Sequence, residues 1–349
     1  IASAPLTLPP TLFTSDNTVL ASRFANFKLK HSRSYESAAK ESARYSIFVE
    51  NLKLIDSRNA EGEKHGTIHG ITRFADLTPT EFERDFLTAR VDDFSATVNE
   101  TIKPLAHGEK LSQDWSGQYT TPVKDQGHCG SCWAFSAVEQ IESDAMRTMG
   151  FSGTLSVQQV NSCDTQDGGC SGGLTYGAYS YVKSARGLVP ESSYSYTSGD
   201  GVTGDCVPAW LTNPQVAVTG AMTVSAQDPP TREAQMAGWV SASGPLSICV
   251  DAHNWQTYDS GVMSADACGT NINHCVQAVG LDTDQGFWKV RNSWGFPWGE
   301  DGHIRLSYGS NTCGLVATPS YTNVAQPVGA SPSAVRSAPW RMPAASTNA

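Results

Sequence analysis

Apolar residues recur at helical spacing in two segments near the start of the chain. The first, residues 18–30, places Phe24 and Phe27 on one face, which predicts a short amphipathic helix. The second, residues 37–60, is longer and is expected to end before Gly62. The opening portion of the chain is therefore predicted to be helical.

One face of the second segment mixes apolar and polar residues. Spacings of 4, 3, 4 and 4 place five residues in a single stripe: Arg44, Phe48, Asn51, Ile55 and Asn59. Spacing alone favours an ordinary amphipathic helix. Arg and Asn interrupt the apolar face, however, and buried polar groups need specific partners. We therefore expect a polar network along this helix.

The strongest helical pattern begins at residue 132. Ser131 is a suitable N-cap and Gly150 a suitable C-terminal residue, so Cys132 is expected at the first helical position. There the unpaired N–H groups and the positive end of the helix dipole favour a thiolate over a thiol. The apolar positions of this pattern are Ala134, Val138, Ile141, Ala145 and Met149.

Runs typical of strands follow this helix. They are GPLSICVDA, HCVQAVGLD, FWKVRNSW and GHIRLSY, all after residue 243. Residues 114–324 are therefore predicted to form one compact α+β unit.

Three segments show no such pattern. Residues 1–17 are rich in Pro and Thr and are predicted to be flexible. Residues 325–349 are rich in Ala, Ser and Pro without acidic residues and are predicted to be a disordered tail. Residues 85–113 are expected to form a linker or an extended strap, and they contain an Asn-x-Thr sequon at Asn99, a pointer to the secretory route.

The composition is that of an ordinary globular protein whose two portions differ in charge. The 349 residues can bury a full core, and no apolar stretch approaches the roughly 18 residues of a membrane span. The formal net charge of −10 argues against a nucleic-acid partner. Residues 1–106 carry 13 basic and 14 acidic side chains, whereas residues 107–349 carry 11 and 20. Nearly all of the negative charge thus lies in the second portion.

All nine cysteines also lie in this second portion. Such density predicts disulfides and an oxidising or secretory compartment. The odd number leaves at least one thiol unpaired.

The pair Cys129 and Cys132 fits three interpretations: half of a zinc site, a redox pair, or a structural cysteine beside a reactive one. Zinc would need a second close pair, whereas Cys163 and Cys170 are seven residues apart. A redox pair would need a βαβ context, which the pattern does not offer. The third interpretation is therefore favoured.

A thiolate nucleophile needs a base and a group that orients the base. His274 in NHCVQAVG and Asn292 in NSWGFPWGEDG follow Cys132 by 142 and 160 residues. With QGHCGSCWAF and CSGG at 170–173, these motifs resemble those of the papain family of cysteine proteases, and of its cathepsin-L-like branch in particular. The resemblance spans residues 19–324. Each of these residues alone would have an ordinary structural explanation. Their joint occurrence, in this order and at this spacing, favours a catalytic role instead.

The resemblance implies a role for each of these residues. Cys132 would be the nucleophile, His274 its ion-pair partner and general acid–base, and Asn292 the residue that fixes the imidazole. Trp294 would shield the hydrogen bond between His274 and Asn292. Gln126 would donate a side-chain N–H to the oxyanion hole beside the backbone N–H of Cys132. The implied reaction is hydrolysis of a peptide bond through a thioester acyl-enzyme.

The same resemblance implies a disulfide pattern. Cys129 would pair with Cys170, Cys163 with Cys206, and Cys268 with Cys313, which leaves Cys132 free. Cys249 and Cys275 remain. They could form a fourth disulfide in the wall of the P2 pocket, or stay as two buried thiols, the alternative that we slightly favour.

Substrate-binding residues also follow from the resemblance. The P2 positions are apolar or small and include no acidic residue, which predicts a hydrophobic P2 side chain such as Leu or Phe. Asn273 stands where the family often has Asp, which could shift the pH profile. The implied set is Gly172, Gly173, Leu174, Thr175, Cys249, Ile272, Asn273, Cys275, Trp294 and Thr318.

The first portion resembles the inhibitory propeptide of the cathepsin-L-like branch. The polar stripe matches its ERFNIN motif, with Lys40 in place of the opening Glu, and GITRFAD at 70–76 matches the motif that follows, with Thr72 for Asn. The resemblance implies a helical propeptide, residues 18–108, that runs through the cleft against the direction of a substrate. Acid is expected to loosen it by protonating carboxylates such as Asp76.

The predicted fold is α+β and papain-like, with a helical lobe around the Cys132 helix and an antiparallel, barrel-like lobe that carries His274 and Asn292. The peptidase domain would span residues 109–324 and be released by cleavage between about residues 103 and 113. We predict an endopeptidase without cofactor or metal, because no gap between the motifs leaves room for an insertion that blocks the cleft. The alternatives are a peptide ligase or transpeptidase on the same fold and a catalytically silent binding homologue.

Expected partners are polypeptide substrates, the chain's own propeptide as inhibitor, and protein inhibitors of the cystatin type. No nucleic acid or membrane is expected, and the protein is expected to be a monomer.

Overall fold

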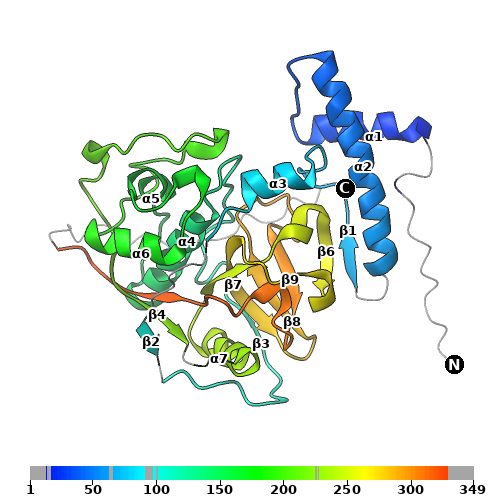
Figure 1. The fold of residues 1–349 in the computed structure, drawn as a ribbon. Helices are drawn as coiled ribbons and strands as arrows, with labels where there is room; N and C mark the ends of the chain where they lie inside the picture. Colours follow the sequence, from blue (N-terminus) through cyan, green and yellow to red (C-terminus); the bar gives the residue numbers. More distant parts are fainter. Residues whose placement is uncertain are drawn as a thin grey trace, which may run out of the picture.

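The computed structural model describes residue 13 and residues 17–62, 66–90, 97–99, 101–224, 226 and 228–328. Within these ranges the chain forms a helical N-terminal part, a lobe of helices and a lobe built on a sheet (Figure 1). None of the helices in these ranges is long and apolar enough to cross a membrane. Most of the segment predicted to be a flexible start and most of the predicted tail lie outside the described residues.

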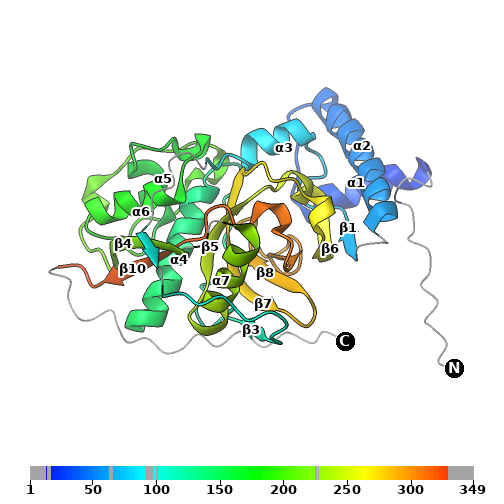
Figure 2. The same ribbon diagram turned by 60° about the horizontal axis from the view of Figure 1, so that its bottom comes forward.

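The N-terminal part contains α1 (Asn17–Lys30), α2 (Ala38–Gly62), β1 (Thr67–His69) and α3 (Pro79–Phe86). Both long helices match the segments predicted from apolar periodicity to within two residues. Figures 1 and 2 show α1 and α2 together at one end of the molecule, with α3 reaching over the junction of the two lobes. The shared core of α1 and α2 contains Leu20, Phe24, Phe27, Phe48, Leu52, Ile55 and Ala75.

The polar residues of the α2 stripe all find partners, as the interrupted apolar face predicts. Arg44 donates to the Glu81 carboxylate at 2.7 Å. Asn51 donates to two backbone carbonyls of the segment that follows β1, at 2.8 Å each. Asn59 exchanges two hydrogen bonds with the backbone of His69. These bonds hold β1 and the chain after it against α2.

The helical lobe is built on α4 (Cys132–Met149), against which α5 (Val157–Cys163) and α6 (Thr175–Ser184) pack. α4 ends at Gly150, whose φ of 64° lies in the left-handed region that glycine tolerates. Ser131 occupies the N-cap position, but its side chain makes no capping hydrogen bond. Ser131 Oγ instead lies 2.8 Å from the Tyr196 hydroxyl.

The larger sheet contains the four runs predicted to be strands: β5 (Leu246–Val250), β7 (His274–Asp282), β8 (Phe287–Arg291) and β9 (His303–Ser307). The strand order is β1-β6-β9-β8-β7-β3, and β5 also pairs with β7. The remaining members are β3 (Ser112–Asp114) and β6 (Tyr258–Met263), and α7 (Pro229–Ala242) packs on this lobe. Short 3₁₀ helices connect the elements: η1 (Gly169–Ser171), η2 (Ser198–Asp200), η3 (Pro208–Trp210), η4 (His253–Thr257), η5 (Ala265–Ala267) and η6 (Thr312–Gly314).

This sheet is less regular than the antiparallel, barrel-like lobe predicted from the sequence. It does not close among the described strands, because β1 and β3 occupy its two ends instead of pairing with each other. β6 and β9 are parallel. A smaller sheet of β10 (Tyr321–Ala325), β4 (Ala217–Val224) and β2 (Thr97–Asn99) includes another parallel pair, β2 with β4. β10 ends at the first residue of the predicted tail.

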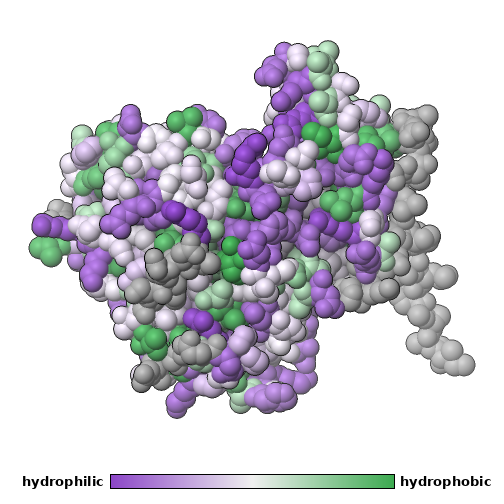
Figure 3. Space-filling view, in the orientation of Figure 1, coloured by the Kyte–Doolittle hydropathy of each residue, from purple (hydrophilic) through white to green (hydrophobic). Residues whose placement is uncertain are grey.

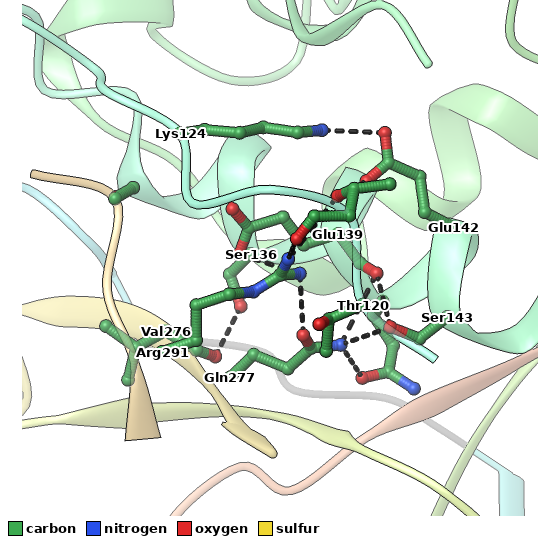
Figure 4. A network of polar contacts seen from close by, with 12 residues as sticks. Thr120, Lys124, Ser136, Glu139, Glu142, Ser143, Val276, Gln277 and Arg291 are labelled. Carbon is green, nitrogen blue, oxygen red and sulfur yellow. Dashed lines mark hydrogen bonds and ion pairs between the residues drawn. The ribbon is translucent and has the colours of Figure 1, made fainter. Parts of the chain in front are cut away.

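A buried polar network joins the two lobes (Figure 4). Arg291 on β8 lies 3.3 Å from the Glu139 carboxylate on α4, and both side chains are 1% exposed. Gln277 on β7 accepts from Arg291 and donates to Ser143 on α4. A buried network of this kind is specific because each unpaired member would cost free energy. It therefore fixes β7 and β8 relative to α4.

Four disulfides are present. They join Cys129 to Cys170, Cys163 to Cys206, Cys249 to Cys275 and Cys268 to Cys313, and Cys132 is the free cysteine. Our slight preference for two buried thiols at positions 249 and 275 is therefore wrong. The two residues lie directly opposite each other on β5 and β7, with Cα atoms 4.0 Å apart, so their side chains meet.

Candidate active site

Cys132 is the first residue of α4 and is fully buried. Burial raises the pKa of the Cys132 thiol, although backbone N–H groups around the sulfur act in the opposite direction. The thiolate expected from the helix N-terminus is thus not favoured in this form of the chain. The physical reason is that loss of solvent costs the charged form more than the helix end returns.

His274 is the first residue of β7 and lies beside Asn292. Its Nε2 is 2.8 Å from Asn292 Oδ1, and because an amide oxygen only accepts, Nε2 carries the proton. Nδ1 is buried without a hydrogen-bond partner, which leaves its lone pair for a proton from another group. Trp294 stacks on the imidazole with ring centroids 4.7 Å apart. Burial lowers the pKa of His274 to about 4.

Gln126 is held in one orientation by three bonds. Its Oε1 accepts from Ser293 Oγ at 2.7 Å, its Nε2 donates to Cys129 O at 2.9 Å, and its backbone N–H donates to Ser293 O. An amide nitrogen has two hydrogens, so a second donor remains. The Tyr196 hydroxyl donates to Gln126 O at 2.8 Å and ties this loop to the start of α4. Sequence reasoning missed Tyr196, for which no motif gave a signal, and Ser293, although it lies inside the NSWGFPWGEDG motif.

Residues 87–90, which we call the strap, cross the site directly after α3. Ala89 N donates to Asn273 O at 2.9 Å, and Arg90 N donates to Gly173 O at 3.0 Å. Thr88 Oγ1 donates to Gly130 O at 2.6 Å. The strap thus bonds the helical lobe at residues 130 and 173 and the sheet lobe at residue 273, over the buried thiol. The sequence predicted an extended strap here but not which of its residues meets the thiol.

The substrate-binding positions expected from the sequence separate into groups. Cys249, Cys275 and Ile272 share an apolar cluster with Cys132 and the strap residue Ala89. Leu174, Thr175 and Thr318 are not members of that cluster. Leu174 precedes α6 and donates its N–H to Asp167, Thr175 begins α6, and the buried hydroxyl of Thr318 has no hydrogen-bond partner.

Glycine at position 172 permits the close approach of the strap. Gly172 has a φ of 103°, and a Cβ built on it would collide with Thr88 O. Asn273, at the position where the family often has Asp, accepts from Ala252 N at 3.0 Å, and its amide nitrogen lies 2.8 Å from His253 Nδ1. These contacts place residues 172 and 273 at opposite edges of the cleft.

Aromatic side chains anchor the N-terminal part beside Trp294. Phe74 and Phe82 meet the indole edge to face, with ring centroids at 5.1 and 5.3 Å, and Phe86 lies at 6.5 Å. The backbone of Phe86 also contacts His274. The N-terminal part therefore covers the candidate catalytic residues with both its strap and its aromatic core. In the ranges the structure describes, no cluster of His, Cys, Asp and Glu is arranged to hold a metal ion.

Comparisons with known proteins agree with this geometry. Residues 110–323 match the family described as "Papain family cysteine protease", and residues 24–82 match the "Cathepsin propeptide inhibitor domain". Cysteine proteinase 1 of Leishmania pifanoi is 36% identical over 323 residues, covering 89% of this chain and 88% of the relative.

Solved proforms resemble the whole arrangement. Digestive procathepsin L 3 of Tenebrio molitor larval midgut has a TM-score of 0.76 at 29% identity, covering 87% of this chain and 99% of that one. The ragweed pollen cysteine protease Amb a 11 in its proform has a TM-score of 0.74 at 29% identity, covering 88% and 96%.

Proposed function

The chain belongs to the papain family of cysteine proteases and is a cathepsin-L-like proenzyme, and we propose that it is a cysteine endopeptidase in which Cys132 is the nucleophile. The observation that carries this proposal is the free Cys132 at the start of α4, in a chain whose other eight cysteines are bonded, beneath a strap that its own propeptide supplies. Propeptide removal would open this position to peptides and water.

The proposed reaction combines Cys132 from the helical lobe with His274 and Asn292 from the sheet lobe. His274 Nδ1, which has no other partner, takes the thiol proton, and Asn292 keeps the imidazole in the required tautomer. Cys132 Sγ attacks the peptide carbonyl, and His274 returns the proton to the leaving amine, which gives a thioester. Water then hydrolyses the thioester. Gln126 Nε2 and the backbone N–H of Cys132 would stabilise the oxyanion, a contribution of about 3 kcal/mol per donor in comparable sites.

The propeptide inhibits by occupying the cleft. Its strap uses the backbone of Gly173 and Asn273, the groups that we propose receive the backbone of a substrate. Gly172, Trp294 and the pocket positions 174, 175, 249, 272, 275 and 318 would complete the binding surface. An apolar P2 side chain such as Leu or Phe follows from the absence of an acidic residue among the pocket positions.

Other properties follow from the family and the surface. We propose cystatin-type proteins as inhibitors, and the secretory pathway with an extracellular, lysosomal or vacuolar destination, since eight cysteines are bonded. The face in Figure 3 carries separate small apolar patches among polar residues, which supports a monomer.

The proposal is tested by acid activation of the full chain. Incubation at about pH 4–5 is expected to remove about 11 kDa of the 37.3 kDa from the N-terminal side, because protonation weakens propeptide docking. Hydrolysis of a peptide with Leu or Phe at P2 should appear together with that loss of mass. A chain that is fully active without any cut would contradict the inhibitory role.

Two propeptide histidines give acid activation a physical basis. Burial lowers the pKa of His69 to about 4, with Arg58 adding to the effect, and burial and three neighbouring cations lower the pKa of His31 to about 4. A released propeptide would expose these histidines to water, and they would then bind protons at a higher pH than in the docked form. Docking is therefore at full strength above pH 6.5 and weakens as the pH falls towards 4.

Replacing His69 by Gln is expected to move the midpoint of acid processing down by roughly half a unit to one pH unit. Gln can keep the contact that His69 Nδ1 makes with Thr257 Oγ1 at 2.9 Å but binds no proton, so up to about 3 kcal/mol of proton-linked weakening disappears. Processing is followed by gel electrophoresis across a pH series. Lys53→Gln, at an exposed side chain of α2 outside the expected cleavage segment, is the control. Equal midpoints for both variants would remove His69 from the mechanism.

A further inference from the structure

The Cys249–Cys275 disulfide joins two strands that are already paired by hydrogen bonds. β5 and β7 pair at five consecutive positions, from Leu246 opposite Ala278 to Val250 opposite His274. The bond also closes the shortest loop of the four disulfides, 26 residues against 41, 43 and 45. The entropic benefit of a cross-link is smaller for a shorter loop and for residues that other contacts already order. Fold stability alone therefore does not single out this position for a bond.

Its position points instead to the cleft. Cys249 and Cys275 share their apolar cluster with the nucleophile Cys132, and Ile272 packs against it. Cys275 directly follows His274, and its backbone N–H lies close enough to the Cys132 sulfur to act against the rise in the pKa of the thiol. The disulfide is thus part of the wall beside the reacting sulfur.

The occupant of this wall in the proenzyme is Ala89. The backbone of the strap is bonded on both sides of this residue, at Asn273 O and at Gly173 O, and the Ala89 side chain lies in the cluster with the two sulfurs. A substrate that uses the same two carbonyls would place a side chain at the same wall. The side chain that the strap places there is a methyl group.

A disulfide is a stiffer wall than two thiols. A free cysteine can rotate about its Cα–Cβ bond and move its sulfur aside, whereas two bonded sulfurs on paired strands have no such freedom. A pocket lined by flexible side chains can yield to a larger ligand, and a fixed one rejects it. Rejection of extra methylenes by fixed apolar walls is typically worth about 10-fold to 200-fold in kcat/KM.

We propose that the Cys249–Cys275 disulfide is a specificity-determining wall that limits the size of the substrate side chain in the place of Ala89, and that opening the bond relaxes this limit. The proposal rests on the proposed endopeptidase function and refines its apolar P2 preference. While the bond is closed, the substrate class is a peptide with a small or medium apolar P2 residue, so the preference for Leu or Phe proposed above is narrowed against Phe. Leu and Phe become better substrates relative to Val once the bond is open.

Opening the bond requires a reductant, for which we name a dithiol. The dithiol transfers two electrons and two protons to the sulfurs of Cys249 and Cys275 and is itself oxidised to a cyclic disulfide. In the proenzyme both cysteines are buried, 2% and 1% exposed, with Ala89 packed in the same cluster. Reduction should therefore be faster after the propeptide has been removed than before.

The test compares activated wild type with Cys249→Ala/Cys275→Ala on peptides that differ only at P2: Ala, Val, Leu and Phe. The ratio of kcat/KM for Phe over Val is expected to rise at least about tenfold in the double variant. Cys163→Ala/Cys206→Ala removes a disulfide that belongs to a different cluster and should keep the wild-type ratio. If the bond merely braced the fold, its removal would lower kcat/KM for all four peptides together. An unchanged ratio for Phe over Val would overturn the proposal.

A second arm uses wild type alone, so the test does not depend on folding of the variant. Dithiol is titrated into the activated enzyme, and thiols are counted after denaturation and alkylation by mass spectrometry. One thiol marks the closed form and three, mapped to residues 132, 249 and 275, mark the open form. The Phe over Val ratio should rise with the second and third thiols, and a ratio that stays constant would overturn the proposal. Hydrolysis of none of the peptides in any form would instead contradict the proposed function.

Discussion

Replacing Cys132 by alanine is expected to lower kcat/KM for peptide hydrolysis by on the order of 10⁵-fold. Catalytic residues that act together lose nearly all of their joint rate enhancement when the nucleophile is removed. Cys132 is the free cysteine of the chain and the first residue of α4. No other thiol can take its place, since the remaining eight are bonded. The measurement is a peptidyl substrate assay after acid treatment.

The same variant should stay at the full 37.3 kDa during acid treatment if processing is the work of this enzyme. Ser136→Ala is a matched control, because Ser136 lies one turn further along α4, with its hydroxyl bonded to Ser247 and to Val276 O. Its activity should remain within several-fold of wild type. Hydrolysis that survives in Cys132→Ala would overturn the mechanism. Hydrolysis by wild type that has been treated with a thiol-specific inhibitor would overturn it as well.

The residues that a sequence can predict here are those with a periodic or a motif signal. Periodicity located α1, α2 and α4, because apolar spacing records which face of a helix is buried, and strand-like runs located β5, β7, β8 and β9. Motif order brought together Cys132, His274 and Asn292. The structure places them at the start of α4, at the start of β7 and just after β8.

Contacts between distant segments have no such signal. Tyr196 orients the Gln126 loop through a side chain that no local pattern distinguishes from other residues. Ser293 lies inside the motif of Asn292, but its bond to Gln126 joins two distant segments and is not recorded in that motif. The raised pKa of Cys132 depends on burial under residues 87–90, which no helix-terminus argument contains. The pairing of Cys249 with Cys275 depends on strand register, which spacing in the sequence does not determine. The sheet stays open because β1 takes its edge, again a contact between distant segments.

Latency at neutral pH is expected to depend on the aromatic anchor of the propeptide. Phe74 and Phe82 are buried, and both meet Trp294 edge to face. Gln256 in the peptidase domain donates to the carbonyl of Phe74 at 3.1 Å, so the same residue is bonded through its backbone. Buried aromatic side chains at the centre of an interface typically contribute about 2–4 kcal/mol each to binding.

Replacing both Phe74 and Phe82 by alanine in the full chain should therefore raise peptide hydrolysis at pH 7, before any acid step, by at least about 10²-fold. The backbone bonds of the strap to Gly173 and Asn273 remain in this variant. They do not suffice for docking, since a backbone hydrogen bond contributes only about 0.5–1.5 kcal/mol net over a bond to water. Activity is measured directly after mixing with substrate, and gel electrophoresis at the same times shows whether the chain is still uncut.

Leu29→Ala is the matched control, because Leu29 is an apolar residue of the same propeptide that is 80% exposed and contributes little to its packing. It should stay as latent as wild type. A double phenylalanine variant that also stays latent, and that is processed over the same pH range, would show that the strap alone blocks the cleft. In that case the affinity would come from the segment over Cys132, and the aromatic cluster would serve only to fold the propeptide.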